Sequence, residues 1–599
     1  MKNIKYLVTF CLLITALSSC EDEVLNLTDP GTPNSAAFFS TEAELEVALV
    51  GIYEQLNYVN ATPFPQILDH TTDFGFSRGN VAGTATVTTG GLTSTDGLVN
   101  GFWNEFYRGI QRANSLLANM ERAKDIATPA RYEEIKAETL FLRSLFYSYL
   151  IELYGDIPFH DESTVDSQDA LPRTPKSEIV SNIIADLEEA AGILPLNPSE
   201  TGRTSANTAN ALIARIALYN GDYTLAAEKA QLVMDSGIQL DSDYESLFNA
   251  NGINSTETLL SLQYVTGVKV HGLSVRQGSR FGGWCQLVPS QQTVDSYETI
   301  NGLPIDEDPD FDPANPFENR DPRLKASIAV PGEVWSGHII ETHSDSLATW
   351  KIENGAKSER VYNPNSTNPA GVSIVDPISG NTFSSGGANR FVAFTGYFWK
   401  KFSDEPTLKQ ETGLWAGAAE HPVILMRYAE VLLTYAEAKI ESGDIDNSVL
   451  DAINAVRERA YNGSGIAYPA ITTTDQTELR RIIRRERKVE LADEGLRLFD
   501  IRRWRIAEKL MNTVLFGSPA NGFSKIGGDL GFIPNIDEDG FVTYPGAPSQ
   551  PRVEKGNLDY RELETRIFDP AKDYLWPIPD AEIQAAASSG ITIEQNPGY

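Results

Sequence analysis

Residues 211–230 read ALIARIALYNGDYTLAAEKA, and residues 429–456 read AEVLLTYAEAKIESGDIDNSVLDAINAV. In both stretches a helix-forming segment with small residues is followed by a Gly-Asp pair and a second alanine-rich segment. Small side chains let two antiparallel helices pack closely, and glycine lets the chain reverse direction at positive φ. Each stretch therefore predicts a helical hairpin that resembles the tetratricopeptide unit, while a generic helical hairpin is the alternative.

The clearest amphipathic helix is predicted over residues 133–154, and Gly155 is expected to end it. Residues 142–156 form a third, weaker copy of the hairpin theme. No continuous array with a period of roughly 34 residues is present, so the repeats are dispersed. Apolar or small side chains recur at steps of three and four, which places them on one helix face: Ile135, Thr139, Leu142, Phe146, Tyr149 and Leu153.

The rest of the chain divides by composition. Residues 265–420 are rich in Gly, Pro, Asn, Ser and aromatic residues and interrupt the helical pattern. We predict a mostly α-helical fold with an irregular, loop-rich region inserted between two helical parts. The predicted segments are a signal peptide (1–19), a lipidated tether (20–40), a helical part (41–264), the loop-rich region (265–420), a second helical part (421–515) and a loop-rich C-terminal segment (516–599).

Residues 480–505 are unusually basic for this chain and read RRIIRRERKVELADEGLRLFDIRRWR. A nucleic-acid or membrane patch is one interpretation. We favour a helix pair in which the arginines meet acidic partners, because several acids lie at helical spacing. The expected partners are Glu486, Glu490, Asp493 and Asp500.

The charge of the whole chain is strongly negative. There are 82 acidic residues against 49 basic ones, and the formal net charge is −33. Such a surface repels phosphate backbones, which argues against nucleic-acid binding. It also disfavours polyanionic ligands unless basic residues gather locally.

The N-terminus has the layout of a secretory signal peptide. Lys2 and Lys5 precede an apolar stretch of about a dozen residues, which is too short to span a bilayer as a mature helix. Leu17-Ser18-Ser19-Cys20 then resembles a bacterial lipobox, in which the cysteine is acylated and becomes the mature N-terminus. Cleavage would leave Cys20 lipidated and Cys285 as the only other cysteine, so no intramolecular disulfide is expected.

Several segments taken together resemble the SusD/RagB family. They follow the family's order along nearly the whole mature chain, and the set is far more specific than any one member. Besides the lipobox, they are residues 38–53 (FFSTEAELEVALVGIY), 137–159, 202–223, 319–323 (NRDPR), 426–443, 484–504 (RRERKVELADEGLRLFDIRRW) and 574–579.

The resemblance implies four dispersed tetratricopeptide-like units and a loop-rich half that carries the ligand site. It implies a lipid-anchored protein on the outer-membrane surface of a Gram-negative cell, acting with a SusC-like TonB-dependent transporter. The implied ligand is an oligosaccharide or polysaccharide, or a peptide as in the RagB branch. A surface glycoside hydrolase and a scaffold that binds only protein are the competing hypotheses.

Two segments, 69–80 and 278–287, fall where the resemblance places ligand contacts. Glycan binding requires flat aromatic faces together with polar groups for the sugar hydroxyls. A stacking tryptophan that the family's pattern would place in the loop before the second helix is absent from residues 79–101. The predicted ligand-binding residues are Asp73, Phe74, Phe76, Arg78, Asn80, Arg280, Trp284, Trp335 and Trp350.

Sequence motifs for catalysis and cofactor binding are missing. The histidines lack zinc-site spacing, and no Walker, dinucleotide or GxSxG motif occurs. The acidic run 306–312 resembles a calcium loop but lacks the glycine and closing glutamate of an EF-hand. We therefore predict neither enzymatic activity, nor a cofactor, nor a metal site.

Overall fold

Two helical hairpins form where the repeated sequence theme predicts them. The first joins α8 (Ala206–Tyr219) to α9 (Tyr223–Met234) through Gly221, whose φ is +81°. The second joins α13 (Tyr428–Ser442) to α14 (Asn447–Tyr461) through Gly443, whose φ is +77°. In this left-handed region a side chain would strain the backbone, so glycine makes both turns. The hairpins neighbour each other because α9 packs against α13.

Our computed structural model describes residues 38–57, 62–165, 170–198, 200–265, 268–276, 285–335, 337–340, 348–362, 373–375, 382–384, 395–403, 421–519, 532–551 and 560–599. The fold is mostly α-helical, as predicted, with a tetratricopeptide-like scaffold. Among these residues no helix has the length and apolarity to cross a membrane. The division of the chain into six segments stays a prediction.

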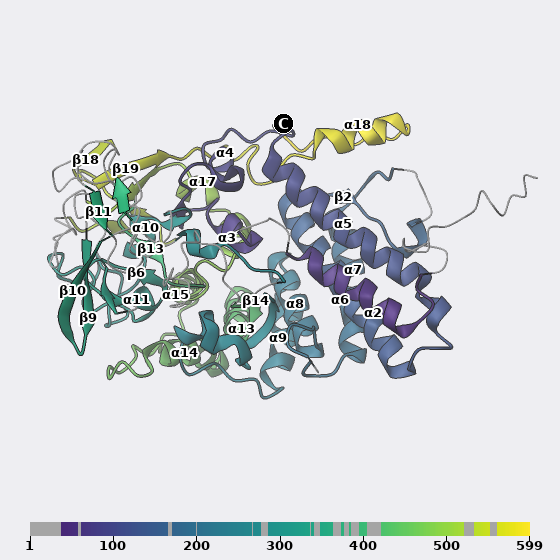
Figure 1. Cartoon of the computed structure of the whole chain (residues 1–599), viewed down its shortest axis with the longest axis horizontal. Helices are drawn as coiled ribbons and strands as arrows, with labels where there is room; N and C mark the ends of the chain where they lie inside the picture. Colours follow the sequence, from purple (N-terminus) through teal and green to yellow (C-terminus); the bar gives the residue numbers. More distant parts are fainter. Residues whose placement is uncertain are drawn as a thin grey trace, which may run out of the picture.

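Long helices fill one end of the molecule, and short strands gather at the other (Figure 1). α6 runs from Pro129 to Tyr154, four residues longer at its start than predicted, and Gly155 ends it. Gly109 of α5 faces α6, and a Cβ there would lie 2.5 Å from the Phe146 ring, so these helices need glycine to approach. The other helices of this end are α2 (Glu42–Gln55), α5 (Gly97–Asn119) and α7 (Lys176–Ile193).

The strands form small separate sheets. β14 (Val423–Arg427) pairs antiparallel with β4 (Thr258–Leu262) and ties the two helical parts together. β2 (Ile157–Pro158) pairs with β3 (Arg173–Thr174) within the first helical part, and each of the other sheets has at least one strand from the loop-rich regions. They include the four strands β7 (Val334–Trp335), β8 (His338–Ile339), β9 (Ala348–Glu353) and β10 (Ala356–Tyr362), and the three strands β15 (Val514–Gly517), β18 (Ser549–Pro551) and β19 (Tyr560–Thr565).

The basic segment 480–505 forms α15 (Gln476–Glu490) and α16 (Arg497–Arg503), and its four predicted acidic partners are ion-paired. Asp500 meets arginines of the segment itself, since Arg487 lies 2.9 Å away. The other three acids pair with arginines from outside the segment, which the sequence could not identify. Those pairs are Arg276 with Asp493, Arg457 and Arg323 with Glu486, and Arg323, Arg427 and Arg459 with Glu490.

Candidate ligand-binding site

A pair of short strands brings the first predicted ligand segment, 69–80, next to the residues that directly follow the second, 278–287. β1 (Gly75–Phe76) pairs antiparallel with β5 (Val288–Pro289), so that Gly75 lies opposite Pro289 and Phe76 opposite Val288. A Cβ at Gly75 would lie 2.7 Å from the Val288 carbonyl oxygen and 2.6 Å from the His70 ring, so only glycine fits. Arg78 leaves the outer end of β1, and Cys285 leads into β5. We call this pair and its flanking residues 77–80 and 285–287 the β1–β5 edge.

A buried apolar cluster packs against the β1–β5 edge. Phe76, Cys285 and Val288 are buried in it with Phe398 of β13 (Phe398–Trp399). Trp335 packs against the cluster as a partly buried member. The contacts bring Trp335, a predicted residue from a third segment, to the same edge.

Asp73 and Phe74 lie behind the edge, in the interior. The Asp73 carboxylate lies 2.9 Å from Arg497 and 3.0 Å from Lys488. Phe74 is 1% exposed, and Phe76 is 5% exposed. All three side chains are buried with structural contacts in this structure, and their role in ligand binding stays a prediction.

A structural role for Asp73 predicts a pH-dependent loss of stability. Burial alone raises the pKa of Asp73, but attraction to Arg497 and Lys488 outweighs it and holds the pKa well below its ordinary value. The folded state therefore binds this proton less readily than the unfolded chain. The contribution of the ionised Asp73 carboxylate to the free energy of unfolding is present above about pH 5 and is lost as the pH falls below about 4.

Asp73→Asn is accordingly expected to lower the denaturation midpoint at neutral pH, because it breaks a buried pair worth about 3–5 kcal/mol. Urea unfolding of wild type and variant across the acid range checks this, and the two midpoints should converge below about pH 4. Equal denaturation midpoints for wild type and Asp73→Asn at neutral pH would refute a structural role for Asp73.

Arg78 and Asn80 lie at the surface end of the edge. Arg78 is half-buried, and Asn80 is exposed. Asn80 has a φ of +54°, and its side-chain oxygen accepts a hydrogen bond of 2.8 Å from the Ala85 amide. The turn is thus held in place beside β1, with both side chains at the boundary with solvent.

Trp335 is half-buried beside the edge. Its ring centroid lies 5.6 Å from that of Phe398, and the Lys400 ammonium lies 5.9 Å from the Trp335 centroid. Lys400 also pairs with Glu245 at 2.8 Å and Glu333 at 3.4 Å, so its position is fixed. A half-buried tryptophan packed against a phenylalanine suits a stacking role.

The remaining predicted residues are placed only in part. Trp350 belongs to β9, in the same four-stranded sheet as Trp335, and pairs across to Arg360. Its side chain lies outside the described atoms. Cys20, Arg280 and Trp284 lie outside the described residues, although Trp284 directly precedes the buried Cys285 of the edge.

No metal-ligand cluster occurs within the described part of the chain. In the acidic run 306–312, Asp308 accepts hydrogen bonds from Thr299 and from Asn301, the latter at 3.1 Å. Asp306 accepts one of 2.7 Å from the Ile536 amide. These carboxylates hold neighbouring loops together.

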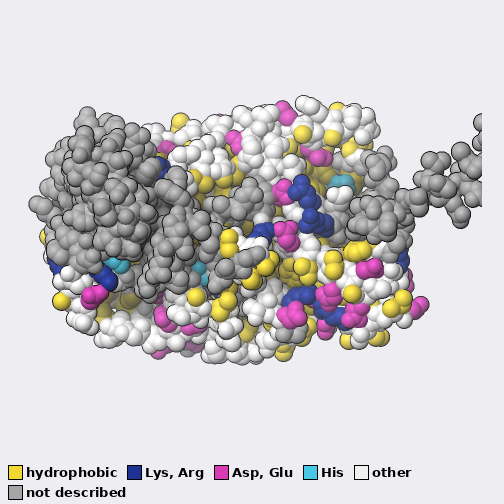
Figure 2. All heavy atoms as spheres, in the orientation of Figure 1, with side chains coloured by type: hydrophobic (Ala, Val, Ile, Leu, Met, Phe, Trp, Pro, Cys, Tyr) yellow, Lys and Arg dark blue, Asp and Glu magenta, His cyan; other side chains and the backbone are white. Residues whose placement is uncertain are grey.

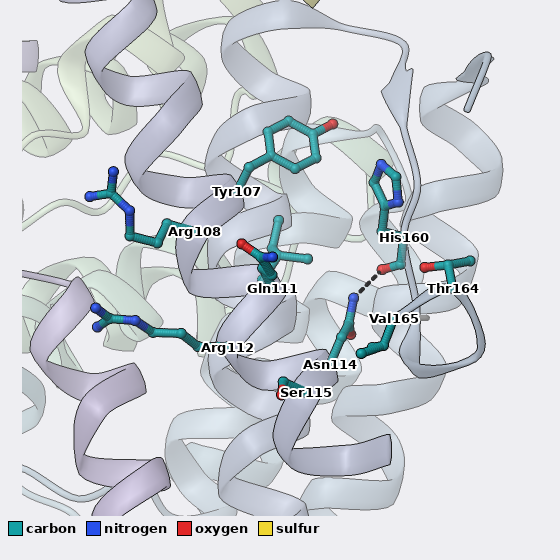
Figure 3. Close-up of a pocket in the computed structure, with 10 residues that line it drawn as sticks. Tyr107, Arg108, Gln111, Arg112, Asn114, Ser115, His160, Thr164 and Val165 are labelled. Atoms are coloured by element: carbon teal, nitrogen blue, oxygen red, sulfur yellow. Dashed lines mark hydrogen bonds between the residues drawn. The ribbon is translucent and has the colours of Figure 1, made fainter. Parts of the chain in front are cut away.

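A groove on the outer face of α5, some 650 Å³ in volume, was missed by the sequence reasoning. Its lining includes Tyr107, Arg108, Gln111 and Arg112 (Figure 3). On an amphipathic helix these residues look like an ordinary solvated face, so no sequence signal distinguished them.

Comparison with known proteins agrees with this architecture. The SusD family model matches residues 245–599, and a model described as starch-binding and associating with the outer membrane matches residues 26–218. The chain therefore belongs to the SusD family, and the resemblance predicted from the sequence is confirmed.

Individual relatives extend over the whole length. The SusD-like protein P2 of Formosa agariphila is 26% identical over 621 residues, which cover 99% of this chain and 100% of that protein. A crystal structure of a SusD-like carbohydrate-binding protein from Bacteroides fragilis has a TM-score of 0.69 at 24% identity, covering 92% of this chain and 99% of that one. A laminarin-binding SusD-like protein has a TM-score of 0.58 at 21% identity, covering 94% and 100%.

Proposed function

We propose that this protein binds a glycan at the cell surface and delivers it to a SusC-like TonB-dependent transporter in the outer membrane. The observation that carries the proposal is family membership over nearly the whole chain, since relatives of similar length and fold are named for carbohydrate or laminarin binding. A matching family model is described as starch-binding and associating with the outer membrane.

The proposed ligand site is the solvent side of the β1–β5 edge. Arg78 and Asn80 supply polar groups there, and Trp335 supplies an aromatic face within the same cluster. Glycan sites combine such faces with a few fixed polar groups. Arg280, Trp284 and Trp350 complete the proposed set, while Asp73, Phe74 and Phe76 hold the edge from within.

A lipid anchor on Cys20 would keep this site at the membrane surface. The signal-peptide pattern and the lipobox support acylation at this residue. Anchoring suits a protein that covers a transporter, because the captured ligand stays near the channel. No enzymatic step is proposed, since the relatives' names describe binding.

Trp284 tests the position of the site. It is preceded by Gly282-Gly283, and glycine lets a backbone approach a ligand closely. Trp284→Ala is expected to weaken glycan binding while the melting temperature stays within a few degrees. A core tryptophan would instead cost about 3–5 kcal/mol of stability. Calorimetric titration and thermal unfolding of the same variant measure both, and a large drop in melting temperature with unchanged affinity would refute the ligand role.

A further inference from the structure

The groove on α5 lies apart from the β1–β5 edge, at the helical end of the molecule. The segment of residues 157–165 borders it on one side, and α2 packs against α5 beside Arg112, which donates to the Gly51 carbonyl oxygen. Tyr107, Gln111 and Ser115 are four residues apart and share one stripe of the helix, while Arg108 and Arg112 form the neighbouring stripe. Figure 3 shows the two arginines on one side of Gln111, and His160 on the other.

The arginine side of the groove presents two guanidiniums, each beside one glutamate. The side chains of Arg108 and Arg112 are 51% and 43% exposed. On the face shown in Figure 2, basic side chains lie over these helices beside a histidine, with acidic side chains next to them. No Asp or Glu is among the described residues that line the groove.

Each arginine contacts the described part of the protein through only one nitrogen of its guanidinium. Arg108 contacts Glu105 through Nη1 at 2.5 Å. Arg112 donates through Nη1 to the Gly51 carbonyl oxygen at 2.6 Å and lies 3.7 Å from Glu54. Within the described residues, Nε and Nη2 of both side chains have no partner. This edge of a guanidinium is one that binds carboxylate or sulfate with two parallel hydrogen bonds.

The rest of the lining provides groups that recognise sugar hydroxyls. Gln111 is exposed and Ser115 is half-buried, and neither side chain has a hydrogen-bond partner in the described part of the chain. Burial lowers the pKa of His160 from its ordinary value, so at neutral pH the ring offers one donor and one acceptor. The Tyr107 hydroxyl donates to the Pro158 carbonyl oxygen at 2.7 Å, which fixes the half-buried tyrosine ring as a wall.

Hydrogen bonds of Asn114 fix the opposite side of the groove. The Asn114 amide donates to the His160 carbonyl oxygen at 2.8 Å, and its side-chain oxygen accepts from Arg143 at 2.9 Å. Arg143 in turn pairs with Asp186 at 2.7 Å. These buried hydrogen bonds fix the position of residue 160 relative to α5, so the groove is formed without a ligand. The volume of the groove lies within the range of about 300–1,000 Å³ for small-molecule sites.

We propose that the α5 groove is a second saccharide site that binds an acidic sugar unit. Arg108 and Arg112 hold its carboxylate or sulfate, and Gln111, Ser115 and His160 bind its hydroxyls. The net charge of −33 disfavours a polyanionic glycan, whereas a local pair of arginines can hold one acidic unit of an otherwise neutral chain. The proposal deepens the proposed function, on which it rests for the class of ligand.

The test is a calorimetric titration of the purified mature protein with three probes: glucuronate, glucose 6-sulfate and glucose. At least one acidic probe is expected to bind, more weakly as salt is added, and glucose is expected to bind far less. Arg108→Gln combined with Arg112→Gln should weaken the acidic probe about tenfold or more. Lys124→Gln combined with Lys136→Gln removes two charges from the same end outside the groove and should change nothing.

Each outcome decides between the readings. Binding of glucuronate alone assigns the carboxylate, and binding of glucose 6-sulfate alone assigns the sulfate. Absence of binding by both, equal binding of glucose, or an equal effect of the lysine control would overturn the proposal. Neutral oligosaccharide binding should survive in the arginine variant. If wild type bound no neutral glycan while the double arginine variant still lost affinity for the acidic probe, the proposed site at the β1–β5 edge would be refuted. The proposal for the α5 groove would then remain supported.

Discussion

Replacing Glu490 with alanine is expected to destabilise the protein by about 3–5 kcal/mol, the usual cost of breaking a buried ion pair from one side. Glu490 is 0% exposed. Its carboxylate lies 2.6 Å from Arg427 and 2.9 Å from Arg323, and it also contacts Arg459. Although burial raises the pKa of Glu490, the arginines lower it by more, so the carboxylate stays charged. Without it, each of these three buried guanidiniums loses a carboxylate contact.

The control for this prediction is the surface pair of Lys136 and Glu189. These side chains are 37% and 46% exposed, and their ends lie 2.5 Å apart. Exposed pairs contribute at most about 1 kcal/mol, so Glu189→Ala should shift the urea midpoint only slightly. Glu490→Gln keeps the side-chain volume and loses the charge. Its urea midpoint should fall between the midpoints of Glu490→Ala and Glu189→Ala. Equal midpoints for Glu490→Ala and Glu189→Ala would contradict a structural role for the buried network.

Cys20→Ala is expected to release the protein from the membrane almost completely. Acyl chains contribute about 0.8 kcal/mol per buried CH₂, and two or more chains anchor stably where one binds marginally. Among the described residues no helix could replace the anchor. Fractionation of cells that lack the transporter partner measures the effect, because binding to that partner could retain the protein.

Ser19→Ala is the matched control for the anchor, since it changes the neighbouring residue and keeps the cysteine. This variant should remain in the membrane fraction. Persistent membrane association of Cys20→Ala, in the absence of the transporter, would show that another feature holds the protein there.

The helical scaffold was predictable because its signals are local. The glycines at 221 and 443 and the apolar spacing of residues 135–153 act within one or two helices. Family resemblance could also be read from ordered segments. In both cases the information lies in residues close to one another in the sequence.

The ion pairs and the site were predictable only in part, because they depend on distant contacts. Asp73 looked like a loop carboxylate, yet its partner Arg497 lies 424 positions away. The Phe74 ring is covered in the same interior, with the Arg497 guanidinium 5.7 Å from its centroid. Burial of this kind is decided by tertiary packing, and a local pattern of aromatic and polar residues cannot reveal it.

The central claim is that the protein captures a glycan without altering it. The most direct test is the binding of purified wild type to a panel of soluble oligosaccharides and polysaccharides, with product analysis of each mixture after prolonged incubation. We predict saturable binding of at least one glycan, with no change in its length. Hydrolysis of the bound glycan, or the absence of binding across the panel together with tight binding of peptides, would contradict the account.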